Sequence, residues 1–418
     1  MVLRGRWSVG LAVAIGLVHC TYGDGIDEVP IVRDSAGVEI VANVGRGSWT
    51  AGTRLQLSAE PVVQFGDALG GEFAFDRVSD VLFVDDSLFI VANQGSGQLV
   101  FVSSGGDRRY TVGRSGSGPG EFDRLTAIGM LPSGYLATFD SGHRRMSVFE
   151  VGGELVRTVP LEIGLQRGVG TMGIGWLDSG TFVARLLGSA GKTATAEIGK
   201  WRLMDSWAEL VLFDDDGMAL RIPVRTPGDQ RLSMLTAREG SEYTIIGLPN
   251  PFLRSFVADA QRDRVAFGHT ADDEIHILDS DGNLVRIIRR NRLGRGLATG
   301  MRNEWIDYRV AGIRDERSRR RRRQQYESMP FPSILPAFRS VVLDEKGRRL
   351  WVEEFELGAI TSRGETHWSV YAEDGHLLGE VAMPSGFEVL RIGGDYVLGL
   401  WKDDLGVEYV QMYELVVG

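Results

Sequence analysis

Three arginines near the start of apolar segments have the chemistry to bind an anion. Arg254 and Arg339 lie in the related tripeptides Leu253-Arg254-Ser255 and Phe338-Arg339-Ser340, and Arg391 lies near an equivalent place in a later segment. A guanidinium group can give a carboxylate or phosphate two parallel hydrogen bonds. The alternative is that each arginine pairs with a carboxylate of a neighbouring segment, for which Asp80 is available.

A second group of polar residues follows apolar runs at several places along the chain. We expect these residues to line the same surface as Arg254 and Arg339, and together they form the predicted ligand-binding set: Asn93, Asp140, His143, Arg144, His269 and Lys402. His143, His269 and Asp140 are also the candidates for metal binding or acid–base catalysis on that surface.

Other chemistries lack their sequence signatures. The Ser-Gly-rich stretch 115–118 contains no G-x-S-x-G nucleophile motif, and the six histidines are scattered with a single cysteine to help them. Residues 279–283 depart from a calcium loop because the glycine comes two positions early. No phosphate-binding loop is present, so we expect no cofactor, and the net charge of −10 argues against nucleic acid as a partner.

An internal repeat supplies the elements that must position these residues. Residues 66–112 align with 113–159 without a gap, at an offset of 47 residues. Each copy contains four short apolar runs separated by turn-forming residues, and in the second copy these runs are 125–131, 135–139, 146–149 and 155–159. Four antiparallel strands in a unit of this length are typical of a β-propeller blade.

The repeat unit also resembles an NHL-type blade. The residues that carry this resemblance are Gly116, Gly118-Pro119-Gly120-Glu121-Phe122, Asp140-Ser141-Gly142, Val148-Phe149 and Gly152-Gly153. The resemblance implies a six-bladed propeller of a bacterial secreted protein or lipoprotein.

Three more blades are marked by acidic-Gly turns at Asp216-Gly217, Asp281-Gly282 and Asp374-Gly375. The last blade has only three strand-like runs, at 387–392, 396–401 and 408–415, whereas residues 62–65 match a fourth strand that has no first three before it. The sequence therefore predicts an all-β, six-bladed propeller of four-stranded antiparallel blades, with the ring closed by an N-terminal strand.

Two insertions, near 188–206 and 291–333, interrupt the later blades. The second predicts one helix, with Met301, Trp305 and Tyr308 on one face, Thr299 capping its start and prolines 330 and 332 ending it. It also contains Arg317 and the run Arg319–Arg323, which is either a solvated helix face or a surface for anionic lipid or another polyanion.

The first residues resemble an export signal. Arg4 and Arg6 precede an apolar run of ten residues, and Cys20 follows directly as the only cysteine. We expect residues 1–19 to be a signal peptide, Cys20 to be lipidated, 20–50 to be a tether and N-terminal extension, and 51–418 to be the propeller. The alternative is ordinary secretion with an incidental thiol at Cys20.

These features favour a non-catalytic binding or scaffold module of the cell envelope. We expect a monomer in the periplasm or at the outer membrane, attached to the membrane only through lipid at Cys20, and binding a protein partner or a small anionic ligand. The site is expected where loops between second and third strands meet loops between blades, since both emerge on one side around the channel mouth. The alternative is an enzyme resembling propeller lyases or lactonases, with its site at the same mouth.

Overall fold

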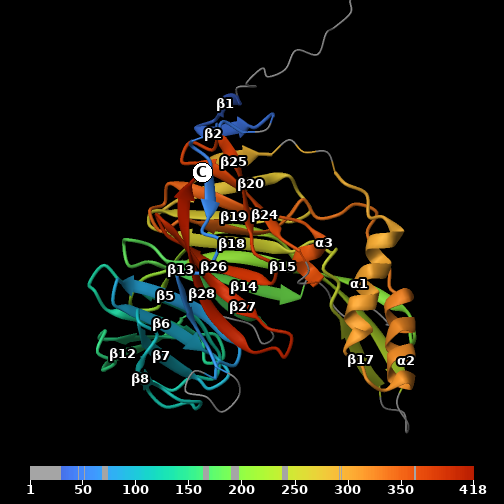
Figure 1. Cartoon of the computed structure of the whole chain (residues 1–418), viewed down its shortest axis with the longest axis horizontal. Coiled ribbons are helices and arrows are strands. Elements are labelled where there is room, and N and C mark those ends of the chain that lie inside the picture. The colour runs from blue at the N-terminus through green and yellow to red at the C-terminus, as the bar shows by residue number, and fades with distance from the viewer. Residues whose placement is uncertain are drawn as a thin grey trace, which may run out of the picture.

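The computed structural model describes residues 30–418 except 46, 51, 68–73, 163–168, 190–196, 238–242, 291, 293, 362 and 363. The predicted signal peptide and Cys20 lie outside the described residues. The described strands form six sheets arranged as a β-propeller, which confirms the predicted fold class (Figure 1).

Blades I and II are the regular four-stranded units that the repeat predicted. Blade I is β5 (Val78–Asp85), β6 (Leu88–Asn93), β7 (Gln98–Ser103) and β8 (Arg108–Val112). Blade II is β9 (Leu125–Met130), β10 (Leu136–Asp140), β11 (Arg145–Phe149) and β12 (Leu155–Pro160). The four strands of blade II begin and end within one residue of the predicted runs, because glycine turns such as Gly153, with a φ of 93°, separate them.

Blades III and IV are larger. Blade III is β13 (Gly170–Trp176), β14 (Phe182–Ser189), β15 (Trp201–Phe213), β16 (Ala219–Ala237) and β17 (Tyr243–Leu248). Blade IV is β18 (Phe256–Gln261), β19 (Arg264–His269), β20 (Glu274–Asp279) and β21 (Leu284–Arg289), to which β2 (Val38–Ala42) and β1 (Ile31–Ser35) are added. The described parts of the segment near 188–206 include the end of β14 and the start of β15, where blade III extends beyond the four-stranded pattern of blades I and II.

Blades V and VI complete the ring. Blade V is β22 (Phe338–Leu343), β23 (Arg349–Glu354), β24 (Thr366–Ala372) and β25 (Leu377–Met383). Blade VI is β26 (Phe387–Ile392), β27 (Tyr396–Lys402) and β28 (Glu408–Val417), with β3 (Leu55–Leu57) and β4 (Val63–Phe65) paired on β28. Val410 is opposite Phe65, so the predicted closure by the N-terminal strand is confirmed.

The N-terminal extension is also bound to the ring. The hairpin of β1 and β2 turns at Ala36 and Gly37, and β2 then runs parallel to β21 on the outer edge of blade IV. The buried Asn43 side chain donates to the carbonyl oxygen of Gly375 at 3.0 Å and accepts from the amide of Leu377 at 2.7 Å. Residues 31–43 therefore join blades IV and V, a contact that the sequence pattern did not predict.

The helical segment differs from the prediction. Two helices form instead of one, α1 (Thr299–Ala311) and α2 (Glu316–Glu327), and a short α3 (Leu357–Thr361) lies in blade V. Thr299 is not the cap of α1, because the N-cap is Ala298 and no side chain bonds there; α2 is capped by Asp315, which accepts from the amide of Ser318 at 2.7 Å. Residues 319–323 lie on α2, where Arg320 pairs with Glu316 and Arg323 with Asp307.

Hydrophobic clusters form between neighbouring blades because one sheet alone cannot bury its own apolar faces. Phe122 and Leu99, for example, pack between blades I and II, and Phe338 and Ile275 between blades IV and V. A further cluster lies outside the ring, where Trp305 and Val310 of α1 pack against Leu232 of β16 and Leu248 of β17. Figure 1 shows α1 and α2 beside β17, on the side of the propeller opposite to β8.

Candidate functional site

The predicted polar residues mark one face of the propeller. Asn93, Asp140, His269 and Lys402 are each the last residue of the second strand in their blades, β6, β10, β19 and β27. We call this side the mouth face. The turns at Asp216-Gly217 and Asp281-Gly282 join third strands to fourth strands, and therefore lie on the opposite side.

Asp140 organises the turn that follows it. Its fully buried carboxylate accepts from the amides of Asp123 at 3.0 Å and Arg124 at 2.9 Å, and its Oδ2 lies 2.7 Å from Nδ1 of His143. Burial alone would raise the pKa of Asp140, but the hydrogen bonds from His143 and the three surrounding backbone amides outweigh it and lower that pKa. The side chain of Arg144 donates to the carbonyl oxygen of Val169 at 2.7 Å. Asp140, His143 and Arg144 therefore all have contacts that stabilise this turn and its surroundings.

Asn93 and Lys402 have similar structural contacts. The Asn93 side chain accepts from the amide of Asp76 at 3.0 Å, which corresponds to the Asp140–Asp123 contact of the next blade. The Nζ of Lys402 lies 2.8 Å from Glu408, and this hydrogen bond raises the pKa of Lys402 despite partial burial.

The three arginines do not share one position, which corrects the sequence-based alignment. Strand β18 begins at Phe256, so Arg254 lies two residues before it. Strand β22 begins at Phe338, so Arg339 lies within it. Arg254 lies 3.4 Å from Asp205 of blade III, and Arg391 lies 2.7 Å from Asp80 of blade I, as the alternative of neighbouring-blade pairs predicted. Arg339 instead pairs at 2.7 Å with Glu353 of its own blade.

The central channel is crossed by the Arg391 side chain. Its guanidinium group also donates to the carbonyl oxygens of Val81 at 2.7 Å and Ile128 at 2.6 Å. A cavity of about 360 Å³ surrounds it, lined by first strands of all six blades and including Asp80, Asp259 and Glu345. Burial raises the pKa of Asp259 to about 6, although the amide of Leu343 and the charge of Arg391 act in the opposite direction.

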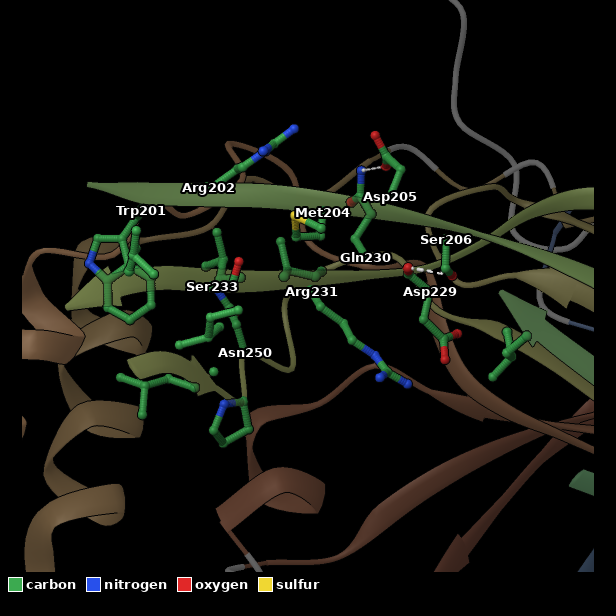
Figure 2. Close-up of a pocket in the computed structure, with 18 of the residues that line it drawn as sticks. Trp201, Arg202, Met204, Asp205, Ser206, Asp229, Gln230, Arg231, Ser233 and Asn250 are labelled. Atoms are coloured by element: carbon green, nitrogen blue, oxygen red, sulfur yellow. Dashed lines mark hydrogen bonds between the residues drawn. The ribbon is translucent and has the colours of Figure 1, made fainter. Parts of the chain in front are cut away.

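A larger hollow lies on the mouth face, where β15, β16 and β17 extend beyond the blade. Its volume is about 1180 Å³, and we call it the groove. Its walls come from three strands and the segment that follows them. The lining residues include Trp201, Arg202, Met204–Ser206, Asp229–Ser233, Leu235, Ile245, Gly247–Asn250 and Leu253. Figure 2 shows that it runs from Asp229 and Ser206 at one end to Trp201 and Asn250 at the other.

Most charged groups of the groove already have partners. Asp205 lies within reach of Arg254 and accepts from Gln230 at 3.1 Å, and Lys200 pairs with Glu197. Asp229 accepts from the amide of Phe256 at 2.8 Å and lies 3.7 Å from Arg185. Arg185 is almost fully buried, and it also donates to the carbonyl oxygen of Phe256.

Arg231 is different because its side chain has no hydrogen bond or ion pair to any residue that the structure describes. It is exposed, lies opposite Met204 in the β15–β16 pairing, and extends in Figure 2 towards Asp229. Its charge also reaches Arg185: burial lowers the pKa of Arg185, Asp229 opposes this effect, and Arg231 adds to the lowering. Arg231 is therefore a cation without a counter-ion, beside a second cation.

His269 and Arg254 lie next to this end of the groove. Nε2 of His269 lies 2.8 Å from the Thr226 hydroxyl, while its buried Nδ1 and the buried Nε of Arg254 have no partner among the described residues. Burial lowers the pKa of His269, with Asp272 acting against this and Arg254 adding to it. The surroundings of His269 therefore favour its neutral form over the imidazolium.

The sequence analysis did not select Arg231, Arg185 or Asp229. The available signal was the stretch from Ala219 to Ala237, which forms one strand of 19 residues and exceeds the usual strand length about threefold. Such an extension has to leave the blade, and its side chains are then not fixed by the packing of the ring.

Within the described residues, no group of three or more histidine, cysteine, aspartate or glutamate side chains is arranged to hold a metal ion. No helix in the described part of the chain is long and apolar enough to cross a membrane.

No protein-family model matches this chain, and no curated protein sequence matches it. Solved structures do resemble it. A Bacteroides fragilis protein described as exported is 12% identical, with 91% of this chain and 99% of that chain covered and a TM-score of 0.46. A Bacteroides vulgatus member of the DUF4221 family is 10% identical, with coverages of 88% and 100% and a TM-score of 0.47.

The virginiamycin B lyase of Staphylococcus aureus is also similar, at 9% identity, with coverages of 87% and 100% and a TM-score of 0.37. At such identities and scores these likenesses carry no argument about activity. The fold assignment rests on the strand pairing within this chain.

Proposed function

We propose that this chain is an exported binding protein whose groove holds a small organic anion. The observation that carries the proposal is the unpaired Arg231 in a groove of about 1180 Å³, slightly above the usual range for small-molecule sites. A carboxylate or phosphate would supply the counter-ion that the protein does not, and a guanidinium group binds either in a bidentate manner. The groove opens on the mouth face, near Arg254 of the predicted set, but its walls come from the extension of blade III formed by β15, β16 and β17.

The proposal includes export and a lipid anchor at Cys20, supported by the signal-like sequence that precedes it. It also retains the NHL-type assignment, supported by the blade II residues that resemble that family. Intact mass of the protein from a membrane fraction should show loss of residues 1–19 and an acyl addition, and Cys20→Ser should release the protein. Cleavage elsewhere with an unmodified Cys20 would contradict the anchor.

The groove assignment is tested by ligand-observed NMR with a mixture of soluble carboxylates and phosphate esters. At least one acid should give a saturation-transfer signal with the wild-type protein and lose it with Arg231→Met. The matched control is Arg225→Met, because Arg225 is an exposed arginine on the same strand that pairs with Glu209 outside the groove. The absence of any signal that depends on Arg231 would contradict the proposal.

A protein partner and the lyase-like or lactonase-like enzyme remain the alternatives. The enzyme alternative would draw on His143, His269 and Asp140. In this structure Asp140 is bonded to His143 and to neighbouring backbone amides, and His269 contacts the Thr226 hydroxyl. Metal analysis of the purified protein distinguishes them, since stoichiometric calcium or zinc whose removal abolishes ligand binding would favour the enzyme.

A further inference from the structure

We infer that the ligand of the groove is amphipathic, with an anionic group at the Arg231 end and an extended apolar part reaching towards Leu235 and Ile245. This inference rests on the proposed function, and it specifies the chemical class of the ligand. It follows from a separation of charge and apolar surface along the groove.

The end near Asp229 carries the charge. Three guanidinium groups lie there, those of Arg185, Arg231 and Arg254. Among the described residues, two carboxylates contact them: Asp229 contacts Arg185, and Asp205 contacts Arg254. Because each carboxylate already contacts another arginine, one positive charge is left over at Arg231. A monoanionic group bound there balances the cluster, whereas a second cation would add to the repulsion between Arg185 and Arg231.

The other end carries the exposed apolar side chains of the groove, beside Arg202 and the Lys200–Glu197 pair. Ile245 is 67% exposed although it lines a concave surface, and it lies opposite Leu235 in the β16–β17 pairing. Leu235 and Ile245 lie on the same face of the sheet as Arg231, because side chains alternate along a strand. Leu248 and Trp201 lie on the other face, which packs against α1. Exposed apolar side chains gathered in a groove favour an apolar ligand, because such a ligand removes them from water.

The two ends are separated by a fixed distance. Arg231 and Leu235 are four residues apart on one strand, which corresponds to about 13 Å. A ligand that reaches both must therefore be elongated, such as a carboxylate or phosphate on a chain of about ten carbon atoms. A small acid reaches only the charged end.

The apolar end is held rigid by packing from behind. Leu232 and Leu248 are buried against Trp305, and Nε1 of Trp201 donates to the Ser328 hydroxyl at 2.9 Å at the end of α2. The α1–α2 pair thus supports the groove from outside the ring. A preformed apolar wall loses little conformational freedom when a ligand binds.

The test is calorimetric titration of the full mature chain with decanoate, butyrate and the uncharged decyl maltoside, all below micelle-forming concentrations. Decanoate should bind at least tenfold more tightly than either of the others. Arg231→Met should weaken decanoate at least tenfold, and Ile245→Ser should weaken decanoate at least fivefold while leaving butyrate within twofold. The controls are Arg225→Met and Ile222→Ser, since Ile222 is an exposed isoleucine of β16 outside the groove.

Thermal unfolding of each variant confirms that it is folded before it is titrated. Butyrate binding within threefold of decanoate, or decanoate binding that is unaffected by Ile245→Ser, would overturn the amphipathic assignment. If Arg231→Met still abolished binding in either case, the proposed anion site would stand. A chain that binds none of the three compounds also overturns this inference, while the acid mixture tested by NMR decides the proposed function separately.

Discussion

Two arginines, Arg290 and Arg231, show how differently the ring and the groove use the same side chain. Arg290, at the junction of blades IV and V, has a side chain with no exposed surface, and its guanidinium group lies 2.5 Å and 2.7 Å from the two carboxylate oxygens of Glu354. Glu354 also accepts from Arg292 at 2.7 Å and from the Ser369 hydroxyl at 2.6 Å. Arg231 in the groove is exposed and has no such partner among the described residues.

The difference teaches where to look for function in a repeat protein. Blade residues at equivalent positions, such as Asn93 and Asp140, satisfy the same backbone groups in successive blades. A side chain on an extension, such as the far part of β16, does not have to bond to the backbone groups of the blade. Substitutions in the ring should therefore change stability, and substitutions in the groove should change binding.

Removal of the closing strand should have the largest effect on the ring. Deleting residues 21–66 takes away β3 and β4 and exposes the edge of β28 together with the core around Phe65, so we expect loss of the cooperative thermal transition. Deleting 21–50 removes the β1–β2 hairpin and Trp49 but leaves closure intact, and should only lower the transition temperature. Circular dichroism measures both, and equal loss in the two truncations would refute closure by β4.

Breaking the buried pair at the junction should have the next largest effect. Glu354→Ala removes the bidentate partner of the buried Arg290 and leaves Asp273, 3.8 Å away, as its only described carboxylate, so we expect a loss of about 3–5 kcal/mol in the free energy of unfolding. The control is Glu316→Ala, which removes an exposed partner of Arg320 and should cost about 0.5 kcal/mol or less. Urea titration measures the free energy of unfolding of both variants. Similar losses in the two would show that Arg290 and Glu354 are not a structural ion pair.

Asp259 predicts a smaller effect that depends on pH. Its pKa is raised from 3.8 to about 6 in the folded state, so the folded chain holds the proton more tightly than the unfolded chain. Stability from this group is present below pH 4 and is lost as the pH rises to 6, on the order of 2–3 kcal/mol in total. Asp259→Asn should therefore gain stability relative to the wild type between pH 4 and pH 7, whereas Asp281→Asn in an exposed turn should not. A pH-independent difference would contradict this assignment.

Arg231→Met should have the smallest effect on stability, within about 0.5 kcal/mol, because no described contact is lost. The same substitution is expected to weaken decanoate binding at least tenfold. Comparison of its urea midpoint with that of Glu354→Ala sharpens the contrast between groove and ring. A destabilisation of Arg231→Met comparable to that of Glu354→Ala would mean that Arg231 is a structural residue.

The sequence was sufficient for the ring because the repeat itself encodes it. The 47-residue offset located the strands of blades I and II, and the same register identified residues 62–65 as the closing strand. These strands are bounded by turns, and the residues that favour a turn are close together in the sequence. The two-helix form of 299–327 was missed because the break at Gly312 lies between two stretches that both favour helix.

The groove could not be predicted in the same way. The chain has 42 arginines, so residue type alone does not distinguish Arg231 from Arg254 or Arg339. What distinguishes them is whether a carboxylate partner contacts the guanidinium group. Glu353 reaches Arg339 through the pairing of β22 and β23, and Asp205 reaches Arg254 through the packing of blade III against blade IV. The absence of a partner is a property of the folded arrangement and leaves no local pattern in the sequence.

The most direct test of the central claim is photo-crosslinking with a decanoate analogue that carries a diazirine at the end of its chain. The account predicts that the label is found on peptides containing Leu235, Ile245 and Pro249, that excess decanoate prevents labelling, and that Arg231→Met abolishes it. Labelling confined to α2 or to the turns at Gly282 and Gly375 on the opposite face, or labelling that persists in Arg231→Met, would contradict it.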